Sequence, residues 1–179
     1  LRNVRLDAAT NARSWQLESF SGDMPGATEL RLGGAVSNDE GRLGFDGELR
    51  ISAGRLDVLS QMWRTPDPDN PLFNLPGELS VNLSLSGGEM GLANGVLTLD
   101  DESHEFASLL TLDGARGALL SARLGDLSAR QSRAILALLP DFVNDKGFGD
   151  TFPNGSIDIA AERATVLDVA GEGLAATFD

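Results

Sequence analysis

The chain has 179 residues, and its 27 acidic and 14 basic side chains give a net charge of −13 at pH 7. So acidic a surface repels phosphate groups, which argues against a nucleic acid partner. Cysteine is absent, and this excludes thiol catalysis, disulfides and cysteine-based zinc sites. No apolar run approaches the roughly 18 residues of a membrane-spanning helix. Because the first residue is Leu1 and not Met, we expect an internal section of a longer protein.

The N-terminal third predicts amphipathic strands that lead into a short helix. Residues 4–8 and 28–35 alternate between apolar and polar, and residues 43–53 do so most regularly. This two-residue period is typical of a strand with one dry face and one wet face. After Arg55 the apolar spacing becomes helical. We therefore expect a short helix over residues 55–63 that buries Leu56, Leu59 and Trp63.

A proline-rich loop follows this helix. Residues 65–71 read TPDPDNP, a proline density that neither a helix nor a central strand tolerates. Residues 65–76 are therefore predicted to separate two subregions, residues 1–64 and residues 77–179. One continuous domain is the alternative organisation.

The second subregion repeats the strand pattern. Residues 77–87 alternate most cleanly, and residues 103–112 and 117–124 predict two strands joined at Asp113-Gly114, a strong hairpin signal. Asn94-Gly95 fits either a tight hairpin turn or a bulge inside a long strand. Ser128 and Gln131 have the spacing of a capping box, which predicts a helix over residues 128–139. The fold class predicted is mainly β, with antiparallel strands and two short helices.

No group of residues indicates catalysis. His104 is the single histidine, and we interpret it as a polar strand residue because no nucleophile motif accompanies it. Two loops are rich in oxygen ligands but lack the spacing of a calcium site: Asp67, Asp69 and Asn70, and Asn144, Asp145 and Asp150. We expect no enzymatic activity, no cofactor and no metal. A non-catalytic acidic β scaffold or adhesion module, stabilised by Ca²⁺, is kept as an alternative function.

The dry strand faces allow two interpretations. Each face can be ordinary core, or several faces can line up as an apolar groove that needs no catalytic residue. Under the second interpretation the groove would be lined by residues of two neighbouring strands: Leu43, Phe45, Leu49, Ile51, Leu79, Val81, Leu83 and Leu85.

Three stretches resemble the AsmA-like proteins of Gram-negative bacteria. GRLGFDGELRISAGRLDVLSQMW, at residues 41–63, resembles their amphipathic strands with an R-L-D-x-L step into a short helix. Residues 21–49 resemble their alternating G-x-L-x-F-x-G-x-L strands, and GVLTLDD, at residues 95–101, resembles another recurring piece. The resemblance extends over about residues 21–139 and concerns pattern, without a catalytic motif.

The resemblance implies an elongated, curved, trough-like sheet with an apolar interior. Such proteins are anchored in the inner membrane, extend through the periplasm, and are associated with outer-membrane biogenesis and lipid homeostasis. The expected function is to bind the acyl chains of a phospholipid or other acyl lipid during lipid transport. The membrane would be contacted only by other parts of the parent chain. Exposed strand edges would allow self-association.

Overall fold

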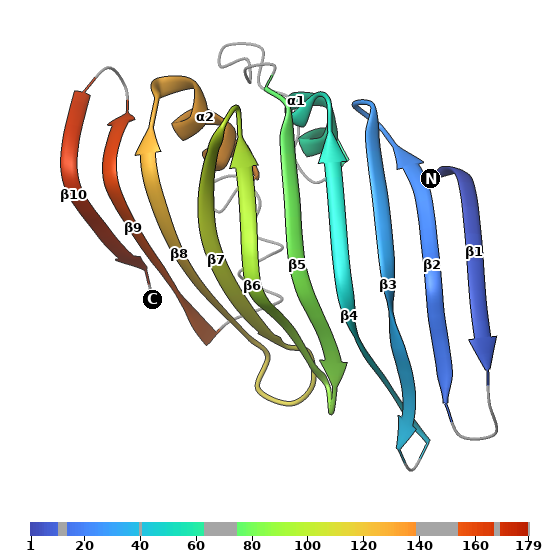
Figure 1. Ribbon diagram of the computed structural model, residues 1–179. Coiled ribbons are helices and arrows are strands. Elements are labelled where there is room, and N and C mark those ends of the chain that lie inside the picture. Colours follow the sequence, from blue (N-terminus) through green and yellow to red (C-terminus); the bar gives the residue numbers. More distant parts are fainter. Residues whose placement is uncertain (11–13, 40, 63–74, 139–153, 167–168, 179) are drawn as a thin grey trace.

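The computed structural model describes the chain except for residues 11–13, 40, 63–74, 139–153, 167–168 and 179. In the described part, ten strands form one open sheet whose order follows the chain (Figure 1). The strands are β1 (Arg2–Thr10), β2 (Trp15–Met24), β3 (Thr28–Asp39), β4 (Arg42–Ala53), β5 (Gly77–Ser86), β6 (Glu89–Leu99), β7 (Glu102–Thr111), β8 (Gly117–Leu127), β9 (Asn154–Val166) and β10 (Val169–Phe178). The mainly β prediction is confirmed.

The sheet is mainly antiparallel, as predicted, and one neighbouring pair makes it mixed. β8 and β9 run parallel, with Leu120 opposite Ile157, whereas the other neighbouring strands run antiparallel. A parallel pair requires a crossover connection of about a dozen residues or more, commonly through a helix. The segment between Leu127 and Asn154 provides that length and contains a helix. The sequence predicted this helix but not the strand direction that follows from it.

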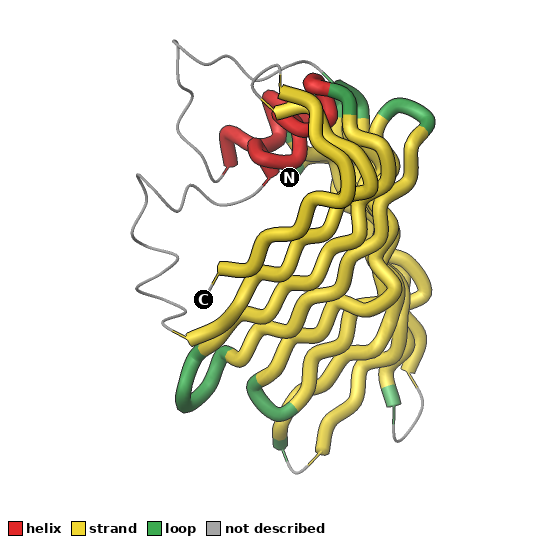
Figure 2. Tube along the Cα trace, turned by 90° about the vertical axis from the view of Figure 1, so that its left-hand side faces the viewer, coloured by secondary structure: helices red, strands yellow, loops and turns green. Residues whose placement is uncertain are grey.

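The helices pack on one face of the sheet, near one end of the strands (Figure 2). Among the described residues these are α1 (Leu56–Leu59), continued by the 3₁₀ turn η1 (Ser60–Met62), and α2 (Ala129–Leu138). We call the face that they cover the inner face and the opposite one the outer face. Leu56 and Leu59 are buried as predicted, and Trp63 lies outside the described residues.

A capping box fixes the start of α2. The Ser128 backbone N–H donates to Oε1 of Gln131 over 2.8 Å, and the Gln131 N–H donates to Oγ of Ser128 over 3.3 Å. Nε2 of the same glutamine donates to the carbonyl oxygen of Leu99 over 3.0 Å. One buried side chain thus both caps the helix and joins it to the end of β6.

The best-buried core lies between the helices and the sheet. Its buried members come from β4, α1, β6, α2 and the residues before β5, and they are Ala53, Leu56, Leu59, Leu75, Leu99 and Ala134. A second cluster, Leu124, Leu127, Ala161 and Ala164, joins β8 to β9. Ile135 packs against both clusters. The core is therefore concentrated at one end of the strands.

The sheet is continuous across the proline-rich segment. β4 and β5 pair in register from Phe45–Leu85 to Ala53–Gly77, so the strands on the two sides of this segment belong to one sheet. Residues 63–74, which include most of the predicted loop, lie outside the described residues. The predicted hairpin at Asp113-Gly114 joins β7 to β8 through residues 112–116.

Asn94-Gly95 forms a bulge and not a hairpin turn. The register of β6 shifts on both sides, between Ser80 and Asn82 on β5 and between Leu92 and Gly95 against β7. Asn94 has a φ of 52°, a left-handed conformation that asparagine tolerates better than most residues. The bulge moves the rest of β6 by one residue relative to its neighbours.

Replacing Leu99 by alanine should destabilise the fold by about 2–5 kcal/mol, because a fully buried leucine leaves a cavity. Leu119→Ala is the matched control, since this leucine is 50% exposed and should shift stability by no more than about 0.5 kcal/mol. Urea unfolding of both variants measures the difference. Equal losses would contradict the location of the core.

Candidate functional site: the apolar inner face

The strand register aligns apolar residues into rows that cross the sheet. One row, called here the long row, runs through all ten strands: Leu6, Phe20, Leu32, Leu49, Val81, Gly95, Phe106, Ala122, Ile159 and Ala176. Val81 faces the Asn94-Gly95 bulge, and the other neighbours in the row are register partners. Because residues opposite each other point to the same face, the row forms a continuous apolar strip of surface at right angles to the strands.

Parallel rows extend this surface on both sides. Nearer the helices lie Leu30, Ile51, Leu79, Leu97 and His104. Farther from them lie Leu17, Gly34, Gly47, Leu83, Leu92, Ser108, Leu120 and Ile157, and then Trp15, Val36, Phe45, Leu85, Met90, Leu110 and Ala118. Within these described positions no side chain is charged, and only His104 and Ser108 are polar.

The residues proposed from the sequence lie on this surface, with one at its margin. Phe45, Leu49 and Ile51 of β4 are opposite Leu85, Val81 and Leu79 of β5, respectively. Leu83 is opposite Gly47. Leu43 pairs only with Asn38 of β3 in the register, beyond the last pair of β4 with β5. It is 75% exposed, so it borders the surface and does not line its centre.

Sequence reasoning missed much of this surface. Leu92, Leu110 and Ile157 belong to it, and alternation within each of their strands was the available signal. Phe20 belongs to it as well, but only because the register of β2 shifts between Leu17 and Phe20. Phe106 and Leu97 lie on it because the bulge in β6 sets the local register. A single strand's pattern cannot reveal which neighbour continues its face.

Burial does not fall steadily with distance from the helices, because Ile51, Leu79 and Leu97 are half-buried and lie nearer to them than Val81 does. Ala53 and Leu99 are buried beneath the helices, and Val81 in the long row is only 2% exposed. Leu83 and Leu85, farther along β5, are half-buried. At the β1 and β2 side, Leu6 is 68% and Trp15 is 61% exposed. One end of the inner face is therefore sealed core, and the rest retains accessible apolar surface.

His104 is the one titratable side chain in the rows described above. It is 1% exposed, its Nδ1 accepts a hydrogen bond from the Gly125 N–H over 3.3 Å, and Nε2 has no partner among the described residues. Burial lowers the pKa of His104, and the negative charge of Glu102 opposes this in part. As predicted, His104 lies on a strand, and the structure adds that it is buried opposite Leu97.

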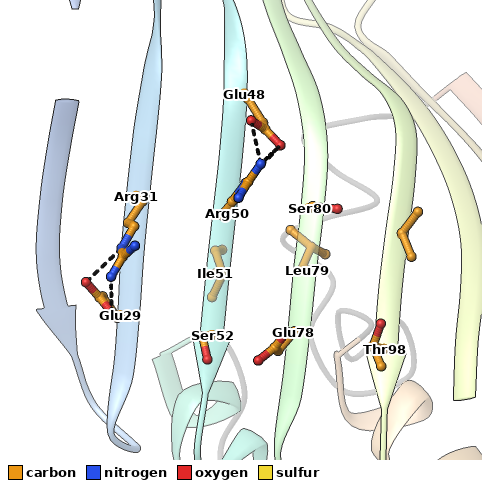
Figure 3. A pocket seen from close by; sticks show the side chains of 11 residues that line it. Glu29, Arg31, Glu48, Arg50, Ile51, Ser52, Glu78, Leu79, Ser80 and Thr98 are labelled. Carbon is orange, nitrogen blue, oxygen red and sulfur yellow. Dashed lines mark hydrogen bonds and ion pairs between the residues drawn. The ribbon is translucent and has the colours of Figure 1, made fainter. Parts of the chain in front are cut away.

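A hollow on the outer face offers a different chemistry (Figure 3). Arg31 pairs with Glu29, and Arg50 pairs with Glu48, through bonds as short as 2.9 Å and 2.8 Å. In each pair the two residues are two apart on one strand, and both side chains are well exposed. Exposed pairs of this kind contribute about 0–1 kcal/mol. The charges of these two pairs offset each other within the chain, and Glu78 also lines the hollow.

Metal binding finds no support in the described residues. They contain no group of three or more histidine or acidic side chains placed to hold a metal ion. The oxygen-rich stretches proposed for Ca²⁺, Asp67, Asp69 and Asn70, and Asn144, Asp145 and Asp150, lie outside the described residues. In the part of the chain that is described, neither helix is long and apolar enough to cross a membrane.

Comparison with known proteins identifies no relative: no family model, curated protein or solved structure matches the chain. The apolar inner face is therefore the feature on which a functional proposal has to rest.

Stability should decrease as the pH falls below about 6.5, the ordinary pKa of histidine. Because burial lowers the pKa of His104 in the fold, the unfolded chain binds this proton first, and protonation then favours unfolding. His104→Asn keeps an acceptor for the Gly125 N–H but does not titrate. Thermal melting between pH 7 and pH 5 should show a shallower decline for this variant than for the parent chain. Parallel declines would contradict the expectation.

Proposed function

We propose that the inner face binds the acyl chains of a phospholipid or other acyl lipid. The observation that carries the proposal is the long row, which crosses all ten strands without a charged or polar side chain. Ten strands spaced by about 4.8 Å give a sheet roughly 43 Å across. An apolar strip of that length suits a long, flexible hydrocarbon better than a compact ligand.

The physical chemistry of such binding is simple. Each CH₂ group moved from water onto an apolar surface contributes about 0.8 kcal/mol, and a chain of many such groups needs no specific contact. The head group stays in water at the margin of the face, so that no charge has to be buried. The half-buried residues farther from the helices, such as Leu83 and Leu85, are the accessible part.

We further propose a non-catalytic role in the periplasm, as part of an inner-membrane-anchored parent protein that conducts lipid toward the outer membrane. The resemblance of residues 41–63 to AsmA-like strands supports this setting. The order of the sheet agrees with it, because strands added in sequence beside β1 or β10 would lengthen every apolar row. The exposed edges also make self-association through strand pairing an expected property.

Photo-crosslinking tests the binding face directly. A benzophenone side chain at position 83 should crosslink to phospholipid from phosphatidylcholine vesicles, because Leu83 belongs to the inner face. The same group at position 84 is the matched control, since Ser84 is the next residue along β5 and points to the outer face. We expect lipid adducts, detected by mass spectrometry, at position 83 only. Adducts in equal yield at both positions, or at neither, would contradict the proposal.

A further inference from the structure

A phenyl ring lies over a glycine in the middle of the long row. Gly95 of β6 is opposite Phe106 of β7. A Cβ atom added to Gly95 would lie 2.5 Å from both Cε1 and Cζ of that ring and 2.8 Å from Cδ1. These distances are too short for any real contact. The Phe106 ring therefore occupies the place that a side chain at position 95 would need.

The same arrangement occurs on β3 and β4. The ring of Phe45 lies over the glycine pair Gly34 and Gly47, where added Cβ atoms would come within 2.8 Å and 2.7 Å of Cζ. There the backbone of the opposite strand also crowds both positions. At Gly95, by contrast, the three nearest atoms all belong to the Phe106 ring. Gly95 is therefore the position where the ring's placement can be changed without a backbone clash.

Side chains on a strand usually stand roughly perpendicular to the sheet. A ring that reclines over a neighbouring glycine projects less than an upright one, and Gly95 beneath the Phe106 ring is buried. Phe106 is half-buried, so its other side remains available to a ligand. In the long row, a ring that lies flat leaves room above the sheet for an acyl chain, whereas an upright ring would block the chain.

We propose that Gly95 is a specificity-determining residue, which allows Phe106 to lie flat so that an acyl chain can pass over the accessible side of its ring. This inference rests on the proposed lipid-binding function. A Cβ at position 95 would occupy the space between β6 and the Phe106 ring. The ring would therefore move away from the sheet and into the path of the acyl chain. The ligand selected in this way is an unbranched hydrocarbon lying across the strands.

The test measures transfer of acyl-labelled fluorescent phosphatidylcholine from phosphatidylcholine vesicles to the chain. We expect Gly95→Ala to weaken binding roughly tenfold, as overpacking of a fitted surface does. Gly95→Ala combined with Phe106→Leu should bind within about twofold of the parent, because the smaller side chain no longer projects. Gly125→Ala is the matched control, since an added Cβ there meets nothing within 4 Å, and it should bind as the parent does.

The outcomes separate this inference from the function on which it rests. If the parent chain takes up no labelled lipid, the proposed function fails. If the parent binds and folded Gly95→Ala binds equally well, or if the double variant is as weak as Gly95→Ala, the role of Gly95 is refuted and the function stands. Should Gly95→Ala fail to fold, Phe106→Trp tests the same clearance with a larger ring. It should lose binding to a similar extent, and unchanged binding would overturn the inference.

Discussion

The structure depends on the phase relation between neighbouring strands. A strand has a period of two residues, so a slip of one residue would turn its whole apolar set to the outer face. Ten strands keep this phase, and as a result the apolar residues of β2 to β9 form shared rows. The bulge at Asn94 maintains the phase in β6. Beyond it, Gly95, Leu97 and Leu99 point inward, and Leu99 becomes part of the sealed core.

The two helices divide the inner face into parts with different properties. At their end, Leu56, Leu59 and Ala134 pack against Ala53 and Leu99, and this closed core supplies stability. Away from it, the same strands continue into further rows with half-buried residues. A sheet stabilised at one end can keep the rest of an apolar face available to a ligand. This arrangement reconciles the two interpretations of the dry strand faces, because core and candidate groove are successive parts of one surface.

The sequence predicted features that are local. Alternation in β4 and β5 identified residues that proved to be register partners, and the Ser128–Gln131 spacing identified the cap of α2. It did not predict features that depend on distant segments. The parallel direction of β9 follows from the crossover through α2, and the burial of His104 follows from its neighbours Leu97 and Gly125 on other strands. Gly95 appeared only as part of a turn or bulge signal, because its close contact with Phe106 requires the register of two strands.

The central proposal is that the inner face binds acyl chains. Its most direct test is an analysis of lipids that co-purify with the chain expressed in the periplasm of a Gram-negative host and isolated without added lipid. Organic extraction followed by mass spectrometry should find phospholipid or other acyl lipid in at least equimolar amount, and Leu83→Glu should carry clearly less than the outer-face control Ser84→Glu. A folded chain that carries no acyl lipid, or two variants that carry equal amounts, would contradict the account.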